Sequence, residues 1–283
     1  MPRSVGKEIG EALLDDLKVY YDDDPDPETA GQGLALAPLI SQVLGQDEWL
    51  HWMMSPAEQA ALVYLLEHLQ PKVGIEIGTR FGGSLQIISK CCGRVYSLDT
   101  DPDVPRRLEG RFPNVEFIIG PSDKTLPPLI DRLQRDRSEL GFVLVDGDHS
   151  AAGVRRDINH LLRFVPIVPM FIVMHDSFNP QCREGLRSAD WAGNVYVHAV
   201  ELDFVPGTVN PTPACRGQLW GGLALGYLKP YERQGRFEVT GRAELTFQNV
   251  VATSPHKSLK HRIRGFIDRV GGVFLRERVG TEE

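Results

Sequence analysis

The residues best suited to chemistry stand at the ends of two strongly apolar runs. Asp146 closes the run 141–146, and His175, followed by Asp176, closes the run 170–175. If both runs are parallel strands about 4.8 Å apart, their side chains meet at one edge of the sheet. Two carboxylates and an imidazole suit a divalent cation, for which oxygen ligands favour Mg²⁺ and the histidine admits Mn²⁺. We therefore predict a metal site formed by Asp146, His175 and Asp176.

A second interpretation of these residues stays open. Regular strand alternation would point His175 and Asp176 to opposite faces, so both can bind a metal only where the strand has given way to a loop. Otherwise the two aspartates would serve turns and a cofactor, and His175 would be hydrogen-bonded at the sheet edge.

His149 lies three residues after Asp146 and is the best candidate for a general base. Histidine titrates near neutral pH, so it can take a proton from a hydroxyl group. A metal beside that hydroxyl would stabilise the developing alkoxide. We predict that His149 and Asp146 are catalytic. The alternative is that His149 caps a helix over residues 151–164.

A glycine-dense turn follows the first strongly apolar run. Within the segment 74–84, glycines allow the backbone to approach a ligand closely, since a Cβ would collide there. The spacing is neither the dinucleotide GxGxxG pattern nor a Walker loop with its lysine. Glu76, inside the run, suits a cationic or amine-bearing ligand.

Asp99 closes the next apolar run, about 20 positions beyond the glycine turn. An acidic residue in this place typically accepts hydrogen bonds from ribose hydroxyls. The alternative is a turn or a helix cap, because Asp101 and Pro102 follow closely.

Together these motifs resemble those of a known enzyme family. IEIGTRFGGS at 75–84 and YSLDTD at 96–101 are similar to motifs I and II of class I S-adenosylmethionine-dependent methyltransferases. VLVDGDHSAAGVRRDI and IVMHDS, at the two later run ends, resemble a subgroup of metal-dependent sugar and antibiotic O-methyltransferases that includes cephalosporin hydroxylase-like enzymes. The sequence departs from such enzymes at His175, where an acidic residue is commoner, and at His149, where a related group has a lysine.

The resemblance implies an enzyme that transfers a methyl group from S-adenosylmethionine to a hydroxyl of a small molecule, preferably a sugar or a glycosylated natural product, with a divalent cation (Mg²⁺ or Mn²⁺). Ser122 would meet the adenine, although it could equally cap a helix. The implied cofactor-binding residues are Glu76, Gly78, Thr79, Gly82, Gly83, Ser84, Asp99, Ser122 and Asp146. The alternative is a cofactor-binding protein on the same fold that is non-catalytic or has a different, hydroxylase-like reaction.

Apolar runs alternate with segments of helical length from residue 73 to residue 175. This alternation predicts an α/β fold with a doubly wound, mostly parallel sheet covered by helices on both faces. Two later runs, 195–204 and 219–228, have no long helix between them and predict a C-terminal antiparallel hairpin at the sheet edge. The resemblance implies seven strands in all.

Ser55, Pro56 and Glu58 form a helix-start signal with a capping box. The segment 255–278 has seven basic residues against two acidic ones, and its apolar residues recur at helical spacing. Such a helix packs on its own domain or on a second subunit, and contact with a membrane surface is the weaker alternative. The predicted regions are an N-terminal helical lid extension, a methyltransferase-like domain and a C-terminal extension, at 1–54, 55–230 and 231–283.

Composition excludes several classes of protein. The chain has 283 residues, a net charge of −7 and 42% hydrophobic residues, which indicates a folded globular protein and disfavours binding of nucleic acid. Its four cysteines include no CxxC pair, which argues against a zinc ribbon or a disulfide framework. The longest apolar run is too short for a transmembrane segment, and the start of the chain lacks a secretory signal. We expect a cytoplasmic homo-oligomer with a small-molecule substrate.

Overall fold

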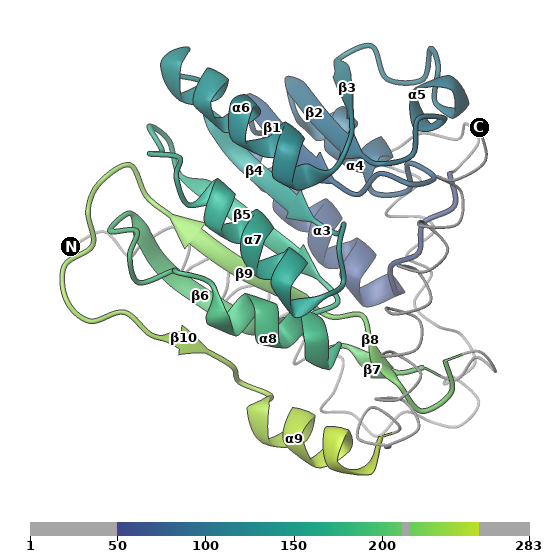
Figure 1. The fold of residues 1–283 in the computed structure, drawn as a ribbon, viewed down its shortest axis with the longest axis vertical. Helices are drawn as coiled ribbons and strands as arrows, with labels where there is room; N and C mark the ends of the chain where they lie inside the picture. The colour runs from purple at the N-terminus through teal and green to yellow at the C-terminus, as the bar shows by residue number, and fades with distance from the viewer. Residues whose placement is uncertain (1–49, 211–214, 255–283) are drawn as a thin grey trace, which may run out of the picture.

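The computed structural model describes residues 50–210 and 215–254, and its centre is an eight-stranded sheet (Figure 1). The strand order is β10–β6–β9–β5–β4–β1–β2–β3. These strands are β1 (Val73–Ile77), β2 (Arg94–Asp99), β3 (Val115–Ile119), β4 (Leu140–Val145), β5 (Met170–His175), β6 (Val197–Val205), β9 (Leu223–Leu228) and β10 (Val239–Thr240). The predicted α/β fold with a mostly parallel sheet is confirmed.

Strand β9 lies between β5 and β6 and runs antiparallel to both, whereas the other pairs in this sheet are parallel. The predicted antiparallel hairpin is therefore present. The predicted run 219–228 divides, however, into β9 and a separate strand β8 (Leu219–Trp220), which pairs with β7 (Thr208–Val209). The prediction of seven strands misses β10, because an element of two residues at the sheet edge leaves no apolar pattern.

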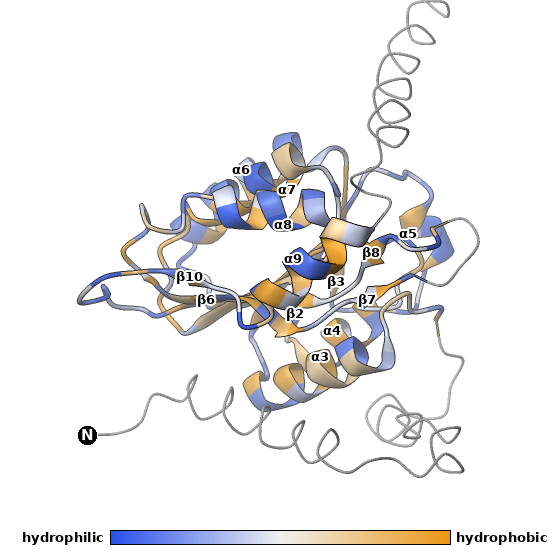
Figure 2. Ribbon diagram, turned by 90° about the horizontal axis from the view of Figure 1, so that it is seen from below, coloured by the Kyte–Doolittle hydropathy of each residue, from blue (hydrophilic) through white to orange (hydrophobic). Residues whose placement is uncertain are grey.

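Helices cover both faces of the sheet, as predicted (Figures 1 and 2). Side chains along the buried strand β4 alternate between the two cores: Phe142 and Leu144 pack on the side of α3 and α4, and Val143 and Val145 on the side of α6, α7 and α8. The covering helices are α3 (Pro56–Leu69), α4 (Leu85–Cys91), α6 (Ser122–Arg135), α7 (Ala151–Leu161) and α8 (Pro180–Ser188).

The predicted capping box at the start of α3 is confirmed. The Ser55 hydroxyl accepts from the backbone N–H of Glu58, and the Glu58 carboxylate accepts from the backbone N–H of Ser55. The helix packs beneath the sheet, which brings its first turn close to the carboxyl end of β5.

A buried arginine side chain links α8 to the C-terminal part of the described chain. Arg183, only 2% exposed, makes ion pairs with Asp203 at 2.7 Å and with Glu244 at 2.8 Å. Glu244 begins α9 (Glu244–Thr253), whose Phe247 packs against Phe178. The short helix α5 (Val104–Arg107) follows β2 on the other side of the domain.

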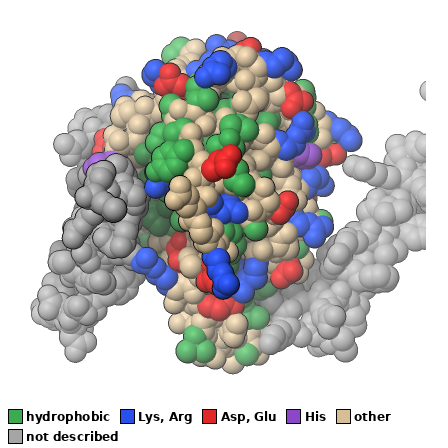
Figure 3. Space-filling view, turned by 90° about the vertical axis from the view of Figure 1, so that its left-hand side faces the viewer, with side chains coloured by type: hydrophobic (Ala, Val, Ile, Leu, Met, Phe, Trp, Pro, Cys, Tyr) green, Lys and Arg blue, Asp and Glu red, His purple; other side chains and the backbone are tan. Residues whose placement is uncertain are grey.

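Basic and acidic side chains are intermixed on the face seen in Figure 3. No helix within the described ranges is long and apolar enough to span a membrane. The predicted basic helix at 255–278 and most of the predicted lid at 1–54 lie outside the described residues.

Candidate active site

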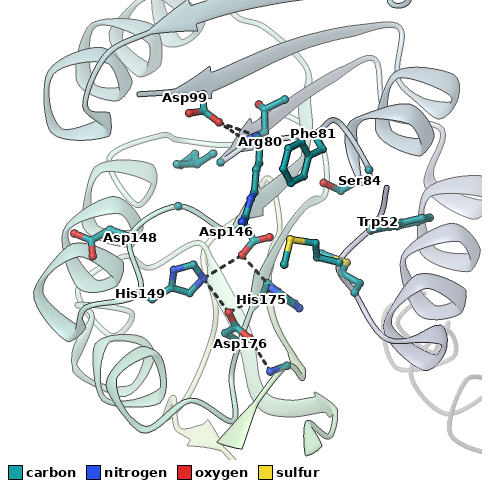
Figure 4. Close-up of a pocket in the computed structure, with 18 of the residues that line it drawn as sticks. Trp52, Arg80, Phe81, Ser84, Asp99, Asp146, Asp148, His149, His175 and Asp176 are labelled. Atoms are coloured by element: carbon teal, nitrogen blue, oxygen red, sulfur yellow. Dashed lines mark hydrogen bonds and ion pairs between the residues drawn. The ribbon is translucent and has the colours of Figure 1, made fainter. Parts of the chain in front are cut away.

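A cavity of about 1080 Å³ opens where β1, β2, β4 and β5 end. This is the edge of an open α/β sheet at which ligands usually bind. The predicted site residues that line it are Gly78, Thr79, Gly83, Ser84, Asp99, Ser122, Asp146, His149, His175 and Asp176. Figure 4 shows how several of these side chains converge from different strand ends.

The glycine turn lies against the loop that follows β4. Gly78 has a φ of +93°, and a Cβ on it would lie 2.1 Å from the carbonyl oxygen of Asp146. A Cβ on Gly83 would lie 2.5 Å from the carbonyl oxygen of His51. These two positions therefore require glycine. Gly82 belongs to the same turn but faces Leu50 instead of the cavity.

Glu76 lies beneath the turn and does not line the cavity. Its Oε1 accepts a 2.5 Å hydrogen bond from the Ser84 hydroxyl, while its Oε2 has no hydrogen-bond partner among the described residues. Burial raises the pKa of Glu76 to about 8. Glu76 therefore contributes to the cavity by holding the hydroxyl of Ser84, which does line it.

Asp99 serves turns, the alternative role that was left open for it, and it also lines the cavity. Its Oδ2 accepts from the backbone N–H groups of Thr79 at 2.9 Å and Arg80 at 2.8 Å, and its Oδ1 accepts from that of Asp101 at 2.8 Å. It thus holds the glycine turn as well as its own turn. A carboxylate has about four lone-pair sites, so it retains capacity for a ligand hydroxyl in the cavity.

Ser122 is the first residue of α6, and Pro121 occupies the N-cap position. The prediction that Ser122 caps the helix is therefore wrong. Its hydroxyl donates a 2.6 Å hydrogen bond to the buried Asp157, whose pKa burial raises. Because this donation uses the only hydroxyl proton, Ser122 can act only as an acceptor toward the cavity.

Four side chains form a tight cluster at the ends of β4 and β5 (Figure 4). His149 Nε2 lies 2.9 Å from Asp176 Oδ2 and 3.6 Å from Asp146 Oδ1. His175 Nδ1 lies 3.0 Å from Asp146 Oδ1 and 3.6 Å from Asp176 Oδ2. The predicted metal ligands and the predicted base are thus direct neighbours.

Asp176 joins this cluster because the strand ends one residue before it. It has a φ of +57°, a left-handed conformation that is uncommon for a residue with a side chain. The backbone N–H of Gly221 donates a 2.6 Å hydrogen bond to its Oδ1. The condition under which His175 and Asp176 can face one ion is therefore met.

The cluster also meets the size requirement of a cation site. Asp146, His175 and Asp176 each offer one ligand atom, and these atoms all lie within 4.8 Å of one another. One nitrogen and two carboxylate oxygens are a donor set compatible with Mn²⁺ and similar ions.

The electrostatics of the cluster hold protons on the histidines. Hydrogen bonds to Asp146 and Asp176 raise the pKa of His149 to about 10. Burial opposes ionisation of Asp146, but the charges and hydrogen bonds of the two histidines outweigh it and lower the pKa of Asp146 to about 2. For His175, burial is likewise outweighed, mainly by Asp146, and its pKa lies well above the ordinary value.

His149 does not cap the helix that follows it. Ser150 is the N-cap of α7, and its hydroxyl accepts a 3.1 Å hydrogen bond from the backbone N–H of Gly153. The capping prediction for His149 is therefore wrong, and the imidazole is directed instead toward Asp146 and Asp176 (Figure 4).

Comparison with known proteins bears on the segment that forms this site. Residues 75–177 match a protein family described as a methyltransferase domain. The chain is therefore similar to methyltransferases over this segment. The segment runs from β1 to just past β5 and so contains the glycine turn, Asp99 and the histidine–aspartate cluster.

The chain also resembles curated proteins. Rhamnosyl O-methyltransferases of Mycobacterium bovis and Mycobacterium tuberculosis are 31% identical to the chain over 122 residues, which is 40% of this chain and 49% of theirs. The chain thus spans about half the length of these relatives.

Among solved structures, cofactor-bound Rv0187 from MTB is 21% identical, with a TM-score of 0.47, over 77% of this chain and 97% of its own. An O-methyltransferase from Bacillus cereus in complex with SAH is 16% identical, with a TM-score of 0.46, over 78% and 100%.

Three contributors to the site were not predicted from the sequence. Glu58, predicted only as part of a capping box, lines the cavity beside His175. Trp220 also lines it, with its ring centre 5.8 Å from that of His149. The turn at Gly221 and Gly222 supplies backbone N–H groups to two carboxylates. The only feature of the sequence that could have indicated this turn is the adjacent glycine pair, which interrupts an apolar run.

Proposed function

We propose that the chain is an S-adenosylmethionine-dependent O-methyltransferase that methylates a hydroxyl of a small molecule, with a sugar or a glycosylated natural product as acceptor. The observation that carries the proposal is the convergence of the glycine turn, Asp99 and the His149 cluster on one cavity of the methyltransferase domain. The choice of a sugar draws support from the rhamnosyl O-methyltransferases among the relatives.

In the proposed site, Asp99 and the glycine turn bind the methyl donor, and Ser122 accepts a hydrogen bond from the adenine amino group. The acceptor lies beside Trp220 and His149. Its hydroxyl oxygen forms a bond to the methyl carbon as the carbon–sulfur bond breaks, and His149 takes the hydroxyl proton. The donor leaves as S-adenosylhomocysteine. Because the sulfonium methyl is already activated, in-line positioning is the main task of the protein.

His149 can act as a base only when it is not already protonated. With a pKa of about 10, it carries a proton at neutral pH as long as Asp146 and Asp176 face it with their full negative charge. A divalent cation held by Asp146, His175 and Asp176 would neutralise these carboxylates and stabilise the developing alkoxide. The proposal therefore makes catalysis dependent on the cation.

The proposal can be tested with methyl-labelled S-adenosylmethionine, Mg²⁺ or Mn²⁺, and a panel of rhamnosides and other hexosides. We expect the label in an O-methyl sugar, and a loss of transfer by roughly 10²–10⁴-fold in His149→Ala. His68→Ala, an exposed histidine on α3, serves as the matched control. Label found only on nitrogen acceptors, or full transfer by His149→Ala, would contradict the proposal.

A further inference from the structure

Glu58 is a buried carboxylate that reaches the predicted metal ligands from α3. Glu58 is only 2% exposed, and its Oε2 lies 3.6 Å from His175 Nε2. An acidic side chain in such a place costs free energy unless it is partnered. The contacts around Glu58 therefore indicate what it does.

The two ring nitrogens of His175 face different carboxylates. Nδ1 faces Asp146 at 3.0 Å and Asp176 at 3.6 Å. Nε2 is buried on the other side of the ring and has no partner within hydrogen-bond distance in the described part of the chain, with the Glu58 carboxylate just beyond that distance. The orientation of the ring thus assigns Nδ1 to the aspartates and Nε2 to Glu58.

Backbone N–H groups hold the Glu58 carboxylate in place. Gly222 donates to its Oε1, and Ser55 donates a 2.5 Å hydrogen bond to its Oε2. The adjacent Gly221 donates to Asp176 Oδ1 at 2.6 Å. One glycine pair therefore fixes two carboxylates on either side of His175. A Cβ on Gly221 would lie 2.7 Å from Glu58 Oε1, so this arrangement leaves no room for a side chain there.

We propose that Glu58 is a positioning residue that accepts the Nε2–H of His175 and so directs the Nδ1 lone pair to a divalent cation between Asp146 and Asp176. The inference rests on the proposed function and deepens its metal site. Metal-binding histidines usually donate their other N–H to a carboxylate or carbonyl, which fixes the tautomer and raises the basicity of the ligand. Here the carboxylate comes from a helix outside the matched methyltransferase segment.

The test is the affinity of the full-length protein for Mn²⁺, measured by electron paramagnetic resonance without methyl donor. Loss of such a carboxylate partner typically weakens metal binding by about 10–100-fold, and we expect this of Glu58→Gln. Glu67→Gln, an exposed position on the same helix, is the matched control. This control should bind Mn²⁺ as the wild type does.

A second measurement uses the wild type alone and does not depend on the folding of a variant. Nitrogen-15 NMR of the Zn²⁺-bound protein should show a proton on Nε2 of His175 and a coordinated Nδ1. A proton on Nδ1, or unchanged Mn²⁺ affinity in Glu58→Gln, would overturn the role of Glu58 while leaving the metal site intact. A wild type that binds no Mn²⁺ would overturn the metal site itself and the role of Glu58 with it.

Discussion

His149 and Asp176 meet at 2.9 Å, from Nε2 to Oδ2, although they follow two different strands. Asp176 Oδ2 also faces His175 Nδ1, so it belongs to the predicted metal ligands. A proton on His149 and a cation therefore compete for the same carboxylate. This competition links the metal to the general base.

The first prediction concerns the titration of His149. Because Asp146 and Asp176 stabilise its charged form, NMR of the metal-free protein should give a pKa of about 10. Addition of Mg²⁺ or Zn²⁺ should lower this pKa, since the cation neutralises the same carboxylates. The variant Asp176→Asn should lower it even without metal. If the pKa of His149 does not change when metal is added, His149 does not share its carboxylates with the metal.

The second prediction separates chemistry from cofactor binding. EDTA and the variant Asp176→Asn should each reduce methyl transfer by about 10²-fold or more, because both remove the cation that would stabilise the acceptor alkoxide, and EDTA also leaves His149 protonated. Binding of S-adenosylhomocysteine should change little, as measured by calorimetry. Asp131→Asn, at an exposed ion pair with Arg163, is the control. Full turnover after both treatments would rule out a role for the metal.

The third prediction concerns the pH dependence of stability. The folded-state pKa of Glu76 is raised to about 8, above the ordinary value of 4.5. Between these two pH values, Glu76 has lost its proton in the unfolded chain but keeps it in the folded protein. The contribution of Glu76 is therefore fully present below pH 4.5 and is lost as the pH rises to about 8.

Glu76→Gln has no such proton to lose. Relative to the wild type, its free energy of unfolding in urea should rise steadily between pH 4.5 and pH 8. Parallel pH profiles for the two proteins would show that Glu76 is ionised in the folded state.

The fourth prediction concerns the turn that holds Glu58 and Asp176. Gly222 and Gly235 have similar positive φ angles, +83° and +96°. An alanine at either position would be held in a left-handed backbone conformation, which costs about 1–2 kcal/mol. Only at Gly222 would the Cβ also collide, 2.7 Å from Ser177 Oγ and 2.8 Å from Gly207 N, because Gly235 has open space around it.

Urea unfolding should therefore show a larger loss of stability for Gly222→Ala than for Gly235→Ala, and only the former should weaken Mn²⁺ binding. Equal losses of stability in the two variants would mean that the turn relaxes at no cost and that its packing does not define the site.

Local patterns were sufficient to predict most of the fold. Buried parallel strands such as β4 are apolar on both faces, so they stand out between helical segments. The carboxyl ends of such strands meet, so the convergence of Asp146, His175 and Asp176 could also be predicted. The left-handed conformation of Asp176 could not be predicted, and neither could its hydrogen bond from Gly221, which lies 45 positions away in the sequence.

The parts of the site that depend on long-range packing were not predictable. Glu58 meets Gly222 across 164 positions of sequence, and only the docking of α3 beneath the sheet brings them together. Glu76 shows the opposite case: its place in the motif suggested contact with a ligand, but the strand buries it beneath Ser84. Periodicity indicates the face of an element, and tertiary packing decides what that face meets.

The most direct test of the central claim is calorimetric titration with S-adenosylhomocysteine, the product that the proposed reaction releases. We expect the wild type to bind it and Asp99→Ala to bind at least about 10-fold more weakly, because Asp99 supplies a charge-assisted hydrogen bond and holds the turn at Thr79 and Arg80. Asp103→Ala, at an exposed aspartate four residues after Asp99, should bind as the wild type does. A folded wild-type protein that does not bind S-adenosylhomocysteine would contradict the account.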